Sequence, residues 1–242
     1  MAEAVATLAV SVWRGGAEGR FVGYAVPRRA NQTVLDVVTY IQQRLDPGLS
    51  YRFACRVGMC GSCAMTVNGR PRWTCRTHVA RVAGADGRIE IAPLANLPVI
   101  KDLACDLSAF FDKWAAARGS FVGTRTRRDD FARVSPAAPQ RRAVDAAIEC
   151  IGCAVCYAAC DVVAWNPDYL GPAALNRAWT LVNDERDGAE RARLSAVAGD
   201  AACHACHSHQ SCTEHCPKSL SPTSSIAGLK RRTGLAALTG KI

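Results

Sequence analysis

The chain has 242 residues, a formal net charge of +9 and 13 cysteines, a length that accommodates one large or two small domains with hydrophobic cores. No run of 18 or more apolar residues occurs in it, which excludes a membrane-spanning helix. The first twelve residues show neither a secretory signal nor an Arg-rich transit peptide, so we expect a reducing, cytoplasmic compartment.

The first hundred residues predict a small β-grasp domain. Thr33 begins a helix with a capping-box pattern, and apolar residues then recur on one face until Pro47-Gly48 ends the helix. Runs rich in β-forming residues, with glycines between the first two, predict strands at residues 5–13, 21–26, 63–68 and 88–91. We therefore expect a first domain over residues 1–100.

The remainder, residues 101–242, reads as a second domain that is mostly helical. Apolar residues at helical spacing predict an amphipathic helix over residues 102–117. The basic stretch 118–142 contains glycines and prolines and is typical of a connecting segment on the surface. Further helices are expected at residues 143–148, 173–182 and 190–197.

The cysteines cluster two and three residues apart, so neighbours converge on one point and indicate metal centres rather than disulfides between distant segments. The first group has the spacing of plant-type ferredoxins and predicts a 2Fe–2S cluster held by Cys55, Cys60, Cys63 and Cys75. Gly58 and Gly61 relieve backbone crowding there and let N–H groups point at the sulfurs. A zinc site is the alternative, although structural zinc usually shows two separate CxxC knuckles and this group has one.

A second group has the spacing of bacterial ferredoxins, in which the fourth cysteine of a run serves the other cluster. That rule predicts a 4Fe–4S cluster on Cys150, Cys153, Cys156 and Cys216. The third site then has three thiolates, which suit a 3Fe–4S cluster, on Cys160, Cys206 and Cys212.

Three further side chains, one histidine and two cysteines, stand outside these ligand sets. A full cysteine run would place a ligand at position 209, where this chain has His209, and that imidazole could bind a fourth iron. Cys203 forms a CxxC with Cys206 and is an alternative ligand. Cys105 lies off the apolar stripe of its predicted helix, which favours a free thiol. The fold class is thus α+β, with a β-grasp plant-type ferredoxin domain followed by an all-α bacterial-ferredoxin-like domain.

Several segments resemble the iron–sulfur subunits of succinate dehydrogenase and fumarate reductase, the respiratory complex II family, nearly from end to end. The matching segments are Ser50–Met65, Asn68-Gly69, Pro93-Leu94, Pro98–Leu103, Cys150–Cys160, Asn166–Ala174 and Cys212–Lys218. Simple ferredoxins share the cysteine spacing but not the other residues of these segments.

The resemblance implies a subunit that relays single electrons between the covalent FAD of a flavoprotein subunit and a membrane quinone. It implies membrane anchor subunits and a peripheral place on the cytoplasmic face of the bacterial inner membrane. No succinate-binding residue is expected on this chain, because the resemblance puts that site on the flavoprotein. Other iron–sulfur subunits, of soluble fumarate reductases or glycolate-oxidase-like complexes, are the alternative. A metal-stabilised protein that binds nucleic acid is a weaker alternative, since no sequence motif of a nucleic-acid-binding fold accompanies the positive charge. We therefore expect no nucleic acid partner.

The same resemblance implies a quinone site at Trp165, His207 and Lys230, for which core packing, a capped surface residue and a solvated charge are the ordinary alternatives. The chain departs from the family pattern in two places: Asp161 replaces a usual proline, and His209 replaces an aliphatic residue. Phrases such as Cys-Tyr-Ala-Ala-Cys favour fumarate-reductase-type relatives and a low-potential quinone such as menaquinone.

Overall fold

The computed structural model describes residues 7–242, so residues 5 and 6 of the first predicted strand lie outside the described part. Two compact units make up the fold. The first contains residues up to 107 together with 151–159, and the second contains residues 108–150 and 160–242. This division differs from a single boundary at residue 100, because a short cysteine-bearing segment returns to the first unit.

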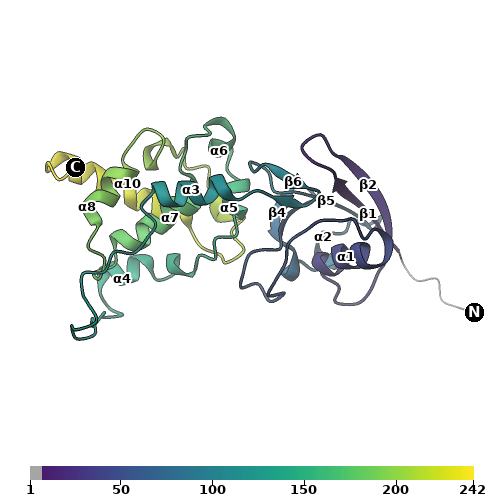
Figure 1. The fold of residues 1–242 in the computed structure, drawn as a ribbon, viewed down its shortest axis with the longest axis horizontal. Helices are drawn as coiled ribbons and strands as arrows, with labels where there is room; N and C mark the ends of the chain where they lie inside the picture. The colour runs from purple at the N-terminus through teal and green to yellow at the C-terminus, as the bar shows by residue number, and fades with distance from the viewer. Residues whose placement is uncertain (1–6) are drawn as a thin grey trace, which may run out of the picture. The chain divides into compact units, whose positions relative to one another are not determined.

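A five-stranded mixed sheet forms the first unit (Figure 1). Strand β1 pairs in parallel with β5, and the other pairs are antiparallel. In sheet order the strands are β2 (Arg20–Pro27), β1 (Thr7–Arg14), β5 (Arg88–Ala92), β3 (Ala64–Val67) and β4 (Arg70–Trp73). A separate antiparallel pair consists of β6 (Val99–Lys101) and β7 (Ala104–Cys105). All four predicted strands are confirmed, and β4, β6 and β7 were not predicted.

The predicted helix covers one side of this sheet as α1 (Val34–Tyr40), followed by a π-helical turn over Ile41–Leu45. The capping box is confirmed, because Thr33 accepts from the Asp36 N–H while the Asp36 carboxylate accepts from the Thr33 N–H. Alternate residues of β1 are buried against the helix. Leu45, the last of the apolar residues that recur at helical spacing before Pro47, is 44% exposed, since the wider π turn shifts it outward. Short helices α2 (Val79–Val82) and α5 (Val155–Ala158) complete the unit.

The expected helix over 102–117 is wrong in its first turns. Helix α3 covers only Ser108–Ala116, and residues 104–105 form β7. Asp102 explains the difference, because its carboxylate accepts from the N–H groups of Gly15 and Ser50 at 2.7 and 2.8 Å and pairs with Arg14 at 3.1 Å. These bonds hold the residues around Asp102 against the sheet. They therefore do not form the first turns of the expected helix.

Acid is expected to destabilise the first unit through Asp102. Burial alone would raise the pKa of this carboxyl, but the N–H groups of Gly15 and Ser50 and the Arg14 guanidinium together lower it. A lowered pKa gives stability that is present above the unfolded-state value, about 4, and is lost as the pH falls below it. Asp102→Asn should cost about 1–3 kcal/mol at pH 7 and remove this acid dependence in urea unfolding. The exposed Asp86→Asn is the matched control, and equal midpoints for the two variants would contradict the prediction.

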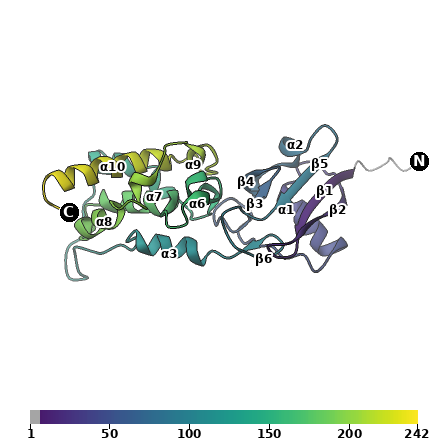
Figure 2. The same ribbon diagram turned by 90° about the horizontal axis from the view of Figure 1, so that it is seen from above.

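The second unit is a helical assembly in which α7 packs against α3, α8 and α10 (Figure 2). Its helices are α3, α4 (Pro139–Val144), α6 (Asp161–Trp165), α7 (Gly171–Val182), α8 (Glu190–Val197), α9 (Ser211–Glu214) and α10 (Pro222–Leu238). The helices expected at 173–182 and 190–197 are confirmed. That expected at 143–148 is wrong, since α4 ends at Val144 and a 3-10 turn follows at Ala147–Glu149. No helix in residues 7–242 has both the length and the apolar character needed to span a membrane.

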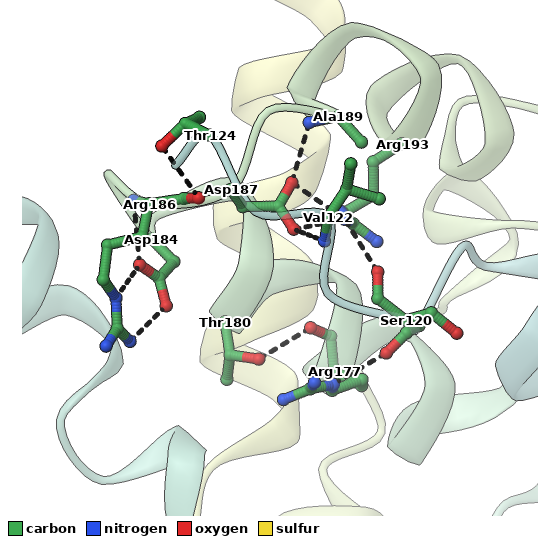
Figure 3. Close-up of polar contacts among 11 residues, drawn as sticks. Ser120, Val122, Thr124, Arg177, Thr180, Asp184, Arg186, Asp187, Ala189 and Arg193 are labelled. Atoms are coloured by element: carbon green, nitrogen blue, oxygen red, sulfur yellow. Dashed lines mark hydrogen bonds and ion pairs between the residues drawn. The ribbon is translucent and has the colours of Figure 1, made fainter. Parts of the chain in front are cut away.

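A buried ion pair attaches the start of the connecting segment to this unit (Figure 3). The side chains of Asp187 and Arg193 are both 0% exposed and lie 2.8 Å apart. Asp187 also accepts from the N–H groups of Val122 and Ala189, and Arg193 donates to the Ser120 carbonyl. The segment is therefore held by backbone and side-chain bonds at residues 120–124. The α+β fold class is confirmed by the two units together.

Candidate metal centres

The first group of cysteines lies in the loop between the π turn and β3 and in the turn after β4. The N–H groups of Met59 and Cys60 donate to the Cys55 sulfur at 3.2 and 3.3 Å, and the Cys55 N–H donates to the Cys60 sulfur at 3.4 Å. Gly58 and Gly61 have φ values of +76° and +71°, which favour glycine. The loop thus directs N–H groups at its sulfurs, as expected from the glycines.

Cys63 and Cys75 are both buried and sit on either side of the β3–β4 hairpin. The Thr74 N–H and hydroxyl both donate to the Cys63 carbonyl, at 3.1 and 2.8 Å, which fixes the two cysteines relative to each other. Burial and the neighbouring Cys63 raise the pKa of Cys75, whereas hydrogen bonds from Ser62 and the Cys55 backbone lower the pKa of Cys60. This donor set of four thiols fits a two-iron cluster, whose binding would remove their protons.

Gly61 lies where the first cysteine loop meets the segment 151–159 within the same unit. A Cβ at position 61 would fall 2.5 Å from the Cβ of Cys153 and 2.8 Å from its Cα. No side chain fits this space, because both atoms belong to a backbone position that cannot rotate away. The glycine therefore permits two cysteine-bearing segments to approach closely.

Gly61→Ala is expected to disturb both segments. The substitution adds the cost of a left-handed φ, about 1 kcal/mol, to a backbone clash. We expect altered 2Fe–2S and 4Fe–4S EPR signals and a lower thermal midpoint, whereas Gly69→Ala, which has a similar φ of +74° and open space around it, should lower stability alone. Unchanged EPR signals in Gly61→Ala would contradict this expectation.

The second predicted ligand set is divided between the units. Cys153 and Cys156 belong to the first unit, where the Asn96 side-chain amide donates to the carbonyls of Tyr157 and Ala158 at 3.2 and 3.3 Å. Cys150 and Cys216 belong to the second unit, where Lys218 pairs with Glu149 at 3.6 Å. Each half is thus held by contacts to its own unit.

The third predicted set, by contrast, lines a single small pocket inside the second unit. Cys160, Cys206 and Cys212 all contribute to its wall, together with Asp161 and His209. The Ser208 N–H donates to the Cys206 sulfur at 3.4 Å, and the Thr223 hydroxyl lies 3.3 Å from the Cys212 sulfur. Burial raises the pKa of the Cys160 and Cys212 thiols. Three thiols around one pocket fit a cluster with three cysteine ligands.

Three aromatic side chains gather beside this pocket. The Trp165 ring lies 6.0 Å from His207 and 5.8 Å from His209, measured between ring centroids, and His207 lies 6.0 Å from His209. Trp165 is 63% exposed, so it is not packed in the core. Lys230 instead donates from Nζ to the Cys206 carbonyl at 2.7 Å, so it is not a freely solvated charge.

The two remaining cysteines are buried and do not line the pocket of the third predicted set. Cys105 is on strand β7 and not on a helix, which corrects the expected placement, and its sulfur lies 3.7 Å from the Leu94 carbonyl oxygen. Cys203 lies 3.7 Å from the Thr233 hydroxyl and is absent from the described lining of the pocket. Among residues 7–242, no three His, Cys, Asp or Glu side chains are grouped to hold a single metal ion.

Tyr169 lines the same pocket as the predicted ligands, and Thr223 contacts one of them, but neither residue was singled out from the sequence. Tyr169 lies in the pocket wall and is only 1% exposed. The only available signal for Tyr169 was its place in the family-like segment Asn166–Ala174, and none existed for Thr223.

Comparisons with known proteins agree with this geometry. Family models for a 2Fe–2S iron–sulfur cluster binding domain and a 4Fe–4S dicluster domain match residues 9–112 and 149–221. The chain is 35% identical to the fumarate reductase iron–sulfur subunit of Haemophilus influenzae, over 84% of this chain and 82% of that one. It is 38% identical to the succinate dehydrogenase iron–sulfur subunit of Paracoccus denitrificans, over 81% and 74%.

A solved structure, the Mycobacterium smegmatis Sdh1 complex in its apo form, contains a chain that superposes with a TM-score of 0.86 at 27% identity, covering 97% of this chain and 98% of that one. Fold and cysteine sites thus define an iron–sulfur oxidoreductase subunit with 2Fe–2S and 4Fe–4S domains. The chain belongs to the family of succinate dehydrogenase and fumarate reductase iron–sulfur subunits.

Proposed function

We propose that this chain carries electrons one at a time between the FAD of a flavoprotein subunit and a membrane quinone. Its cysteines would hold one 2Fe–2S, one 4Fe–4S and one 3Fe–4S cluster on the ligand sets given above. Each cluster, when bound, exchanges single electrons, which lets a two-electron flavin reaction supply a one-electron path. The substrate site would lie on the flavoprotein, and anchor subunits would hold the chain at the cytoplasmic face of the membrane.

The observation that carries this proposal is the pocket of the second unit. Three cysteines line it, a fourth position is occupied by His209 instead of cysteine, and the exposed Trp165 lies beside it. Thiols set around one pocket with a polar, accessible aromatic rim support a terminal centre that delivers electrons to a quinone. Trp165 and His207 would contact that quinone, and Lys230 would act through the Cys206 backbone.

Assays of the intact complex test this function. The expected result is succinate-dependent reduction of a quinone, or quinol-dependent reduction of fumarate, with menaquinone analogues preferred over ubiquinone analogues. Trp165→Ala should raise the KM for quinone while leaving succinate oxidation by an artificial flavin acceptor unchanged. A complex that turns over neither pair, although it holds FAD and all three clusters, would overturn the proposal.

Asp161→Asn is expected to raise the reduction potential of the three-cysteine centre. Asp161 is exposed, begins α6 and lines the pocket. A carboxylate near a cluster stabilises the oxidised, less negative form, so its neutralisation favours reduction by a few-fold in the equilibrium constant. Potentiometric EPR checks the shift, with the exposed Asp168→Asn, outside the pocket lining, as the control. A potential that stays the same or falls would refute the prediction.

A further inference from the structure

The hydroxyl of Thr223 lies 3.3 Å from the sulfur of Cys212, one of the three thiols that line the pocket of the second unit. Thr223 is the second residue of α10, and Cys212 is buried on α9. Hydroxyl and sulfur groups can each donate or accept a hydrogen bond. What Thr223 does at the pocket therefore depends on the direction of this bond.

Thr213 determines that direction. Its hydroxyl donates to the Thr223 oxygen at 3.0 Å and accepts from the Thr223 N–H at 3.4 Å. The hydrogen of the Thr223 hydroxyl is therefore not directed at Thr213. In the described part of the chain, the acceptor within its reach is the Cys212 sulfur. A threonine hydroxyl has a single hydrogen, so this arrangement makes Thr223 the donor and the sulfur the acceptor.

Further hydrogen bonds hold both threonines in place. Ser221 is the N-cap of α10, and its side chain accepts from the Ser224 N–H at 3.3 Å. The Ser221 hydroxyl also lies 3.4 Å from that of Thr213 and 2.8 Å from that of Ser224. Thr223 is β-branched, which restricts rotation about its χ1 angle. The first turn of α10 thus fixes the donor beside the sulfur.

We propose that Thr223 is a positioning residue that donates a hydrogen bond to the Cys212 sulfur and so raises the reduction potential of the centre held by Cys160, Cys206 and Cys212. Reduction adds negative charge to such a centre, and a donor fixed at one of its sulfurs stabilises the reduced form more than the oxidised form. This inference rests on the proposed three-iron centre.

Thr223→Val in the intact complex tests the inference, because valine removes the hydroxyl and keeps the branched shape. Potentiometric EPR should show that the equilibrium constant for one-electron reduction of the three-iron centre falls about three- to tenfold, which is about 28–59 mV. The potentials of the 2Fe–2S and 4Fe–4S clusters in the same samples should stay unchanged. Thr223→Ser retains a hydroxyl and should keep the wild-type potential. A role in packing alone would give the opposite order, since serine loses the methyl group that valine keeps.

Thr233→Val is the matched control. Thr233 is a buried threonine of the same helix, and its hydroxyl lies 3.7 Å from the sulfur of Cys203, which is outside the proposed ligand sets. This variant should leave the three-iron potential unchanged. An unchanged potential in Thr223→Val, or an equal fall in Thr233→Val, would overturn the inference. Absence of an oxidised three-iron signal in the wild type would instead overturn the proposed cluster assignment.

A second pair of variants decides if Thr223→Val does not assemble. Thr223→Ala and Thr223→Ser differ by one oxygen atom, so their comparison isolates the hydroxyl. A lower three-iron potential in Thr223→Ala than in Thr223→Ser supports the inference, and equal potentials overturn it.

Discussion

Asp187→Ala is expected to lower the free energy of unfolding by about 3–5 kcal/mol, because it leaves Arg193 charged and buried without its partner. Two guanidinium nitrogens of Arg193, Nε and Nη1, already lack a hydrogen-bond partner among the described residues. The variant also removes the acceptor of the Val122 N–H. The strand-like contact between residues 122–124 and 186–188 should therefore open together with the ion pair.

Urea unfolding of the intact protein checks this value. Asp184→Ala is the matched control, because Asp184 pairs with the exposed Arg186 at 2.7 Å, and such a pair contributes about 0–1 kcal/mol. The double variant Asp187→Leu with Arg193→Met should recover much of the lost stability, since removal of both charges leaves no unpaired ion. Equal midpoints for Asp187→Ala and Asp184→Ala would show that the buried pair does not have this role.

Cys212→Ala is expected to abolish the three-iron EPR signal and to lower the rate of quinone reduction more than about 100-fold. That loss exceeds the roughly 10- to 100-fold effect of changing a residue that only contacts a metal ligand. Cys212 is buried in the pocket, and its neighbour Thr223 has a hydroxyl that is a poor substitute for a thiolate. Succinate oxidation by an artificial flavin acceptor should persist. The measurements are EPR of the oxidised complex and paired assays with the two acceptors.

Cys203→Ala serves as the control for that experiment. Cys203 is as buried as Cys212 but contacts Thr233, so its loss should leave the three-iron signal in place. Retention of the signal in Cys212→Ala together with its loss in Cys203→Ala would reverse the assignment and make Cys203 the ligand.

Local sequence patterns predicted the elements that local rules determine. The Thr33 capping box and the alternation in β1 are confirmed because each is decided within a few residues. The longest helix, α10, was not predicted, because its glycines and polar residues weaken any apolar stripe. Its Gly228 has a tertiary reason: a Cβ there would lie 2.5 Å from the Trp179 ring. A glycine that makes room for a side chain on another helix leaves no periodic pattern in the sequence.

Cysteine spacing predicted which loops carry the candidate sites, because ligands of one cluster recur at fixed intervals. It was silent on the contact of Thr223 with Cys212 and on that of Lys230 with Cys206, which join positions 11 and 24 residues apart in the chain. The error at Cys105 has a similar origin, since an apolar stripe fits a buried strand as well as a helix until Asp102 is seen to bond to the sheet.

Iron and acid-labile sulfide counted per chain in the anaerobically purified complex, with EPR of the oxidised and reduced states, tests the assignment of three clusters most directly. We predict about nine iron atoms, a three-iron signal when oxidised and two-iron and four-iron signals when reduced. A colourless, iron-free chain, or one with about ten iron atoms and no three-iron signal on oxidation, would contradict it.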